Sequence, residues 1–173
     1  MKKSSIPNIF TFINLSCGII AILYTFKFDY LLASIFILLA GLVDRYDGRI
    51  ARYLNVTSEI GKELDSLADL VSFGVAPSLL MFTIYNLSEY GPFGSIGLGV
   101  LLLLPICGAF RLAKYNISSF DGVYTGVPIT IVGCFLALVV LVTLNLTIPT
   151  IIPVILMILG SYLMVSNMKL KKL

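Results

Sequence analysis

Residues 42–73, LVDRYDGRIARYLNVTSEIGKELDSLADLVSF, carry most of the acid of an otherwise apolar chain. Six of the nine carboxylates lie between Asp44 and Asp69, and long apolar stretches run on either side. The chain has 173 residues, of which 58% are hydrophobic and 12% charged, and its mean hydropathy is +1.02. A water-soluble domain of this size could not bury so much apolar surface. The sequence therefore predicts a membrane protein that gathers its charge in one place.

The lengths of the apolar stretches predict the fold. A hydrocarbon core about 30 Å thick requires about 20 apolar residues per helix. By that measure we expect an all-α integral membrane protein with six transmembrane helices, and a single domain that covers residues 1–173. Polar and turn residues separate the spans. The predicted spans are 8–26, 30–52, 62–86, 94–115, 127–146 and 149–167.

The lysines and arginines predict the topology. With these spans, eleven of the twelve positive charges fall on one side of the membrane, and only Lys27 falls on the other. The positive-inside rule places the positive side in the cytoplasm. We therefore expect a multi-pass protein of the cell membrane, with both termini and the charged stretch facing the cytoplasm.

The spacing of the aspartates predicts a metal site. Asp44 and Asp47 are three residues apart, and Asp65 and Asp69 are four apart, so each pair lies on one face of its helix. Two antiparallel helices would point all four carboxylates into one small space, where they repel one another unless cations lie between them. Oxygen-only ligation suits a hard ion, Mg²⁺, Mn²⁺ or Ca²⁺. Because Mg²⁺ is often bound together with substrate phosphates, a phosphate-bearing substrate is expected.

Small residues and one arginine accompany the aspartates. Gly48 and Ala51, with Gly61 on the facing helix, leave space for a flat group to lie on the helix surface. Arg52 offers a cation to a phosphate or to a base edge. The alternative is that the small residues only permit close helix packing, as they do in membranes. Because the chain has no histidine, acid–base chemistry would fall to Asp, Glu, Lys, Tyr or water.

The complete spacing, D-x2-D-G-x2-A-R-x8-G-x3-D-x3-D from Asp44 to Asp69, resembles the signature of the CDP-alcohol phosphotransferase family. The resemblance implies a six-helix membrane enzyme that transfers the phosphoryl-lipid part of a CDP-linked lipid to a hydroxyl acceptor and releases CMP. It implies one or two Mg²⁺ or Mn²⁺ ions, with Ca²⁺ as a non-productive occupant. The implied metal ligands are Asp44, Asp47, Asp65 and Asp69.

The resemblance also assigns further roles. Asp69 would serve as general base on the acceptor hydroxyl, a natural role for an aspartate beside a metal in a chain without histidine. Asn8 and Thr11 begin the first span on the cytoplasmic side and could reach the nucleotide, although capping of that helix explains them equally well. The expected CDP-lipid-binding residues are Gly48, Ala51, Arg52, Ser58, Gly61, Asn8 and Thr11.

Segments outside the motif indicate the acceptor. IPNIFTFINLSCGIIAI, GAFRLAKYN, FDGVYTGVPIT and SYLMVSNMKL resemble the small bacterial and archaeal phosphatidylserine synthases, over residues 6–168. This resemblance implies CDP-diacylglycerol and L-serine as substrates, membrane lipid around the protein, and a homodimer; no nucleic-acid partner is expected. Few cations beyond the motif are expected near the aspartates, with Arg45 and Arg49 off their face, which favours serine over a phosphate-bearing acceptor.

Three residues are candidates for binding serine. Arg111 and Lys114 lie at the cytoplasmic end of the fourth span, where a cation could bind the serine carboxylate or the phosphate of another acceptor. Both could instead only mark the cytoplasmic side. Ser72 is near enough to Asp69 to line the acceptor pocket, or its hydroxyl bonds to its own helix backbone.

Two alternative functions stay open. The same chemistry could use glycerol 3-phosphate or inositol phosphate as acceptor. From another class, a small divalent-cation transporter would also carry intramembrane carboxylates.

Overall fold

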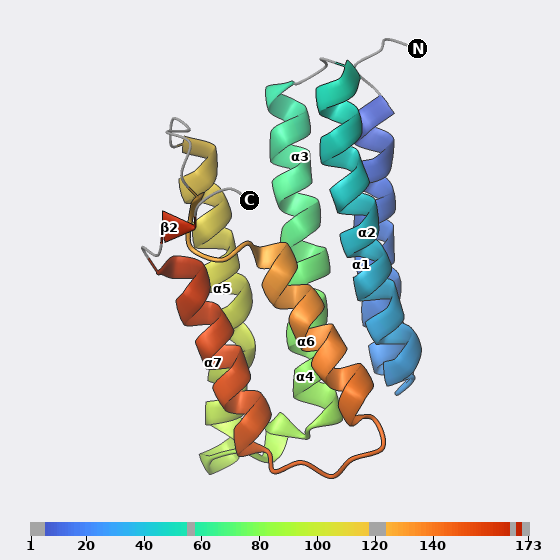
Figure 1. The fold of residues 1–173 in the computed structure, drawn as a ribbon. Coiled ribbons are helices and arrows are strands. Elements are labelled where there is room, and N and C mark those ends of the chain that lie inside the picture. Colours follow the sequence, from blue (N-terminus) through green and yellow to red (C-terminus); the bar gives the residue numbers. More distant parts are fainter. Residues whose placement is uncertain (1–5, 55–57, 118–123, 167–168, 171–173) are drawn as a thin grey trace.

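A computed structural model describes residues 6–54, 58–117, 124–166 and 169–170, with side chains for 8–46, 58–117 and 126–166. These residues form six helical segments that run up and down as one bundle (Figure 1). The elements are α1 (Ile6–Phe26), α2 (Tyr30–Leu54), α3 (Glu59–Asp69), the π-helical η2 (Leu70–Val75), α4 (Ala76–Ile84), the short 3₁₀ turns η3 (Leu87–Glu89) and η4 (Pro92–Gly94), α5 (Ser95–Ile117), α6 (Ile129–Thr143) and α7 (Ile151–Val165). Two short antiparallel strands, β1 (Tyr124–Thr125) and β2 (Lys169–Leu170), complete the described part.

Each predicted span coincides with one helical segment, and the third consists of α3, η2 and α4 in one continuous run. The strand pair is the exception to the all-α prediction. Among the described residues, three runs are long and apolar enough to cross a membrane: Asn8–Phe26, Glu59–Ile84 and Pro92–Ile117. α6 and α7 are also apolar but shorter, with 15 residues each. These lengths and compositions are those of a membrane-embedded helical protein.

The segment formed by α3, η2 and α4 lies at the centre of the bundle. Its π-helical part contacts α1, α2, α5 and α6. Phe73, Leu80 and Met81 of this segment are fully buried. On the outer surface, large apolar side chains such as Phe110 and Ile155 are more than half exposed, which suits contact with lipid rather than water.

Glycines allow the neighbouring helices to approach this central segment. A Cβ added to Gly133 of α6 would lie 2.7 Å from the Cα of Phe73, closer than real side chains pack. A Cβ on Gly18 of α1 would overlap the side chain and backbone of Ser72. Small residues at helix crossings are the usual means of close packing in membranes.

The π-helical turn η2 begins directly after Asp69. The N–H of Ala76 donates to the carbonyl of Val71, five residues back, so the turn is one residue wider than in an α-helix. Pro77, in the first turn of α4, has no N–H to offer the preceding turn, which favours the wider form. The last aspartate of the motif therefore lies where the helix changes its geometry.

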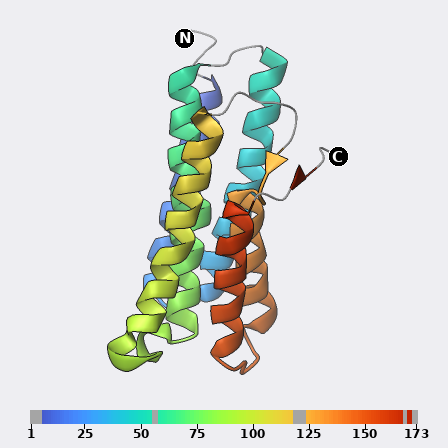
Figure 2. The same ribbon diagram turned by 90° about the vertical axis from the view of Figure 1, so that its left-hand side faces the viewer.

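α1, α3 and α4, and α6 run in one direction, and α2, α5 and α7 run in the other. Figures 1 and 2 both show that α6 and α7 occupy only part of the bundle's length, because α2, α3 and α5 extend beyond them at the upper end. The charged ends of α2 and α3 lie at this upper end. α1 begins there, and the last turn of α7 also points towards it.

Candidate functional site

Three aspartates from two facing helices meet near the upper end of the bundle. One carboxylate oxygen each from Asp44 of α2 and from Asp65 and Asp69 of α3 lie within 4.8 Å of one another. Asp69 is buried, with 8% of its surface exposed, and the other two are partly exposed. The four-residue spacing on α3 places Asp65 one turn above Asp69 on the same face. The structure thus brings together three of the four aspartates expected to converge.

The fourth aspartate, Asp47, belongs to the last turns of α2. Its side chain lies outside the described residues, and so do those of Gly48, Ala51 and Arg52. The expected metal and CDP-lipid contacts of these four residues stay predictions.

The three aspartates line an open cavity of about 500 Å³. Residues from α2, α3, the end of α5 and the beginning of α6 form its walls. Three cationic side chains line it as well. One of them, Arg45, was expected off the aspartate face and instead reaches the cavity. The lining residues are Asp44, Arg45, Lys62, Asp65, Ser66, Asp69, Arg111, Leu112, Tyr115, Asn116, Pro128, Ile129 and Thr130.

Asn14 of α1 contacts the most buried aspartate. Its amide Nδ2 donates a hydrogen bond of 3.0 Å to Asp69 Oδ1, and both residues are buried. Asn14 could not be singled out from the sequence, because it belongs to no recognisable motif. The available signal was its place in the middle of an apolar span, where a polar group needs a partner.

Thr130, in the first turn of α6, is a second residue that the sequence analysis missed. Its hydroxyl donates to Asp44 Oδ2 at 3.4 Å, a long and therefore weak hydrogen bond. This contact joins residues 86 positions apart in the chain and closes the site on the side of α6.

The rim of the cavity is held by contacts between α3 and the end of α5. The amide Nδ2 of Asn116 donates to Ser66 Oγ at 3.0 Å and to Glu63 Oε1 at 3.2 Å. Lys62 Nζ donates to the carbonyl of Asn116 at 3.2 Å and lies 5.4 Å from the centre of the Tyr115 ring. These contacts fix the distance between the two helices that flank the opening.

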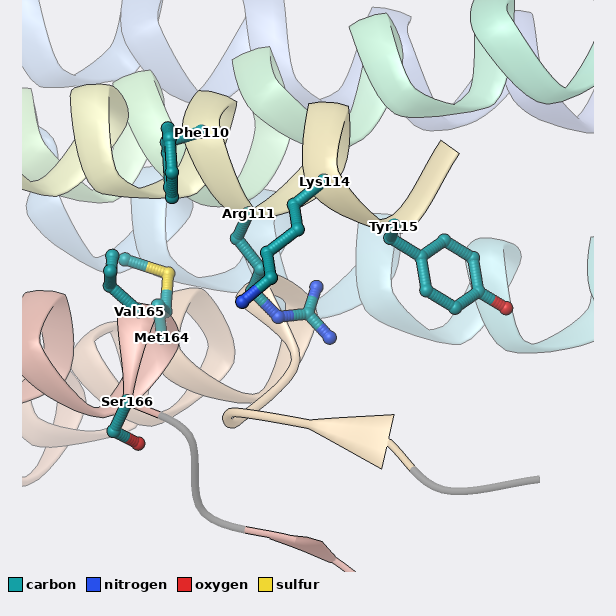
Figure 3. A pocket seen from close by; sticks show the side chains of 7 residues that line it. All are labelled: Phe110, Arg111, Lys114, Tyr115, Met164, Val165 and Ser166. Carbon is teal, nitrogen blue, oxygen red and sulfur yellow. The ribbon is translucent and has the colours of Figure 1, made fainter. Parts of the chain in front are cut away.

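The three candidate serine-binding residues occupy different places. Arg111 lines the cavity with Asp69, and its buried Nε has no hydrogen-bond partner among the described residues. Lys114 lies in a smaller recess of about 20 Å³ between α5 and α7, which Arg111 also lines (Figure 3). Ser72 is fully buried, and its hydroxyl donates to the backbone carbonyl of Asn14 on α1 at 3.0 Å rather than to a carbonyl of its own helix. Ser72 is not among the described residues that line the cavity.

The remaining candidates for CDP-lipid binding lie where α1 and α3 begin. Ser58 caps α3, because its hydroxyl accepts the N–H of Gly61 at 3.0 Å. A Cβ on Gly61 would lie 3.3 Å from Asn8 Oδ1, so this glycine lies close to α1. Thr11 is buried. None of the four is among the described residues that line the cavity, and their contact with the nucleotide stays a prediction.

Comparison with known proteins identifies the family that this chain matches. The family model described as CDP-alcohol phosphatidyltransferase matches residues 4–166. The CDP-diacylglycerol–serine O-phosphatidyltransferase of Bacillus subtilis is 40% identical over 167 residues, which cover 95% of this chain and 88% of the relative. The enzyme of the same name from Helicobacter pylori is 38% identical over 138 residues, 78% of this chain. The archaetidylserine synthase of Methanothermobacter thermautotrophicus is 35% identical over 130 residues, 73% of this chain. The matched parts span 56% and 54% of the lengths of the last two relatives.

Proposed function

The chain belongs to the CDP-alcohol phosphatidyltransferase family, and we propose that it transfers the phosphatidyl group of CDP-diacylglycerol to the hydroxyl of L-serine. In this reaction the serine oxygen forms a bond to the phosphorus of the phosphatidyl group. The bond from that phosphorus to the bridging oxygen breaks, and CMP leaves with the electron pair. One observation carries the proposal: three carboxylates within 4.8 Å of one another, in a cavity that Arg111 also lines.

The donor set fits a hard divalent cation. Asp44, Asp65 and Asp69 offer only oxygen, and their oxygens are close enough to share one or two ions. We assign Mg²⁺ or Mn²⁺ to this site, with Asp47 as a further ligand from the next turn of α2 and Ca²⁺ as a non-productive occupant. When bound, the cation neutralises charge on the diphosphate and on the departing CMP.

Asp69 is assigned as the general base. It is the most buried of the three carboxylates, and it lies at the inner end of the cavity lining on α3. Its carboxylate would accept the proton of the serine hydroxyl as the new bond to phosphorus forms. Asp65, one turn nearer the opening, would remain a metal ligand throughout.

Arg111 is assigned to the serine carboxylate. A guanidinium offers two parallel donors that match the two oxygens of a carboxylate, and its buried Nε has no partner among the described residues. Lys114, one turn further along α5, would add positive charge from the neighbouring recess. Ser72 is fully buried and does not line the described cavity, so we assign it no direct contact with serine.

We further propose that all six helical segments cross the membrane, with the cavity and both termini on the cytoplasmic side, and that two copies form a dimer. The orientation is supported by the gathering of charge at the end where α2 finishes and α3 begins. The dimer is supported by family resemblance.

Competition among acceptors tests the serine assignment. Purified protein would receive CDP-diacylglycerol, Mn²⁺ and equal concentrations of L-serine, glycerol 3-phosphate and inositol phosphate, and the lipid products would be separated. Phosphatidylserine as the dominant product is expected. If the product made from glycerol 3-phosphate or inositol phosphate dominated instead, the type of reaction would stand but the acceptor would not be serine. Mn²⁺ uptake into sealed vesicles, with no release of CMP from CDP-diacylglycerol whichever acceptor is supplied, would favour a transporter instead.

A further inference from the structure

We propose that Asn14 is a positioning residue for Asp69: its amide holds one carboxylate oxygen, Oδ1, and leaves the other to act on the substrate. This inference rests on the proposed function. It assigns different tasks to the two oxygens of one side chain, and it places a determinant of activity on α1, which contributes no described residue to the cavity lining.

Asn14 contacts both sides of the point where α3 becomes η2. Its side-chain Nδ2 donates to Asp69 at 3.0 Å, and its backbone carbonyl accepts the hydroxyl of Ser72, three residues later, at 3.0 Å. Gly18, one turn further along α1, brings that helix so close that an added Cβ would overlap Ser72. One residue of α1 therefore contacts both the carboxylate and the turn that directly follows it.

The Asp69 carboxylate needs a fixed hydrogen-bond partner, because it lies where the helix changes its geometry. Asp69 is the last α-helical residue before the π-helical turn, and wide turns of this kind are frequent at functional sites. An aspartate side chain can rotate about two bonds, so its carboxylate needs a fixed partner to keep one orientation. Asn14 provides this partner from a different helix.

The chemistry of an amide suits the task. Lysine or arginine at position 14 would add positive charge next to the three carboxylates and would compete with a cation for them. An amide N–H binds a carboxylate oxygen without a net charge. Asn14 can thus orient Asp69 and leave the charge of the aspartate cluster available to a metal ion.

Asn14 is poorly explained by packing alone. Its Oδ1 is buried and has no partner among the described residues. A buried acceptor without a hydrogen bond is unfavourable, and an aliphatic side chain in this apolar stretch of α1 would avoid that cost. The donor side of the amide, which reaches Asp69, is therefore the reason for its presence.

The test compares purified full-length wild type with Asn14→Ala and Asn14→Asp. The aspartate variant keeps the volume of the side chain and replaces the donor by an acceptor. Leu80→Ala, in the buried part of α4, is the control for lost stability. We would measure kcat and KM for both substrates, the unfolding temperature, and Mn²⁺ binding by calorimetry without substrate.

Both Asn14 variants are expected to lower kcat by about 10- to 100-fold, the usual loss when a group that orients a reacting side chain is removed. KM for CDP-diacylglycerol should change little, and Asn14→Ala should still bind Mn²⁺, because all the carboxylates are present. Leu80→Ala should lower the unfolding temperature at least as much and keep its kcat at temperatures where it is folded.

Wild-type kcat in either Asn14 variant would overturn the inference, and so would an equal loss of kcat in Leu80→Ala. Absence of any CMP release by the wild type is a different result. It would overturn the proposed function, and this inference with it.

Discussion

The Thr130 hydroxyl in the first turn of α6 lies 3.4 Å from Asp44 Oδ2 on α2. This contact places the beginning of α6 against the aspartate cluster, so four helices, α2, α3, α5 and α6, form the walls of the cavity. The site is therefore a property of the assembled bundle, although all its expected metal ligands come from one short stretch of sequence.

Thr130→Val removes the hydroxyl and keeps the shape of the side chain. Because the hydrogen bond to Asp44 is long, we expect only a modest loss, less than about tenfold in Mn²⁺ affinity. The dependence of CMP release on Mn²⁺ concentration measures it. Thr25→Val is the control, since the Thr25 hydroxyl bonds within the described residues to the Ala21 carbonyl of its own helix. An equal loss of Mn²⁺ affinity in that variant would mean that Thr130 has no specific role.

Asp65→Asn should change the unfolding temperature in opposite ways without and with metal. Three carboxylates within 4.8 Å repel one another, so removal of one charge should raise the unfolding temperature of the metal-free protein. The same change removes a proposed ligand and should reduce the further rise that Mn²⁺ produces. Thermal unfolding with and without Mn²⁺ measures both. An undiminished Mn²⁺ effect in the variant would argue against Asp65 as a ligand.

Arg111→Gln should weaken serine binding. Loss of a charged hydrogen-bond donor in the cavity is expected to raise KM for serine by about 10- to 100-fold, with KM for CDP-diacylglycerol little changed. Lys114→Gln, in the neighbouring recess, should give a smaller rise. Steady-state kinetics with each substrate varied in turn measures this; equal rises in both KM values would mean that Arg111 acts on the whole site rather than on serine.

Two glycines provide a matched test of the packing. Gly133→Ala would bring a Cβ to 2.7 Å from the Phe73 backbone, and we expect a loss of about 1–3 kcal/mol in the free energy of unfolding. Gly99→Ala meets nothing within 4 Å and should be neutral or stabilising by up to about 1 kcal/mol, because alanine favours a helix. Denaturant unfolding in detergent compares them. Equal stability of the two variants would contradict the described crossing of α6 over η2.

Much of the fold could be predicted from the sequence because the membrane restricts the choices. Apolar stretches of about 20 residues give helices of the required length, and the six segments follow. The strand pair β1–β2 could not be predicted, since two residues carry no periodic pattern. The π-helical turn after Asp69 was also missed, because a change of one residue in the turn leaves the apolar pattern almost intact.

The aspartate cluster could be predicted because spacings of three and four place side chains on one helix face. The partners of the cluster could not, because Asn14 and Thr130 lie 55 and 86 positions from the aspartates they contact. Arg45 was expected off the aspartate face, but it lines the cavity. A shortage of cations near the aspartates is therefore a weaker argument for serine than the sequence alone indicated.

The proposed reaction is tested most directly by assay of the wild type beside Asp69→Asn. Purified protein would be incubated with CDP-diacylglycerol, Mn²⁺ and labelled L-serine, and phosphatidylserine and CMP would both be measured. We expect the two products in equal amounts from the wild type. In the variant, whose amide cannot accept the proton, we expect the rate of product formation to fall by about 100- to 10,000-fold. An undiminished rate in a folded Asp69→Asn variant, or no CMP from a folded wild type that binds Mn²⁺, would contradict the proposal.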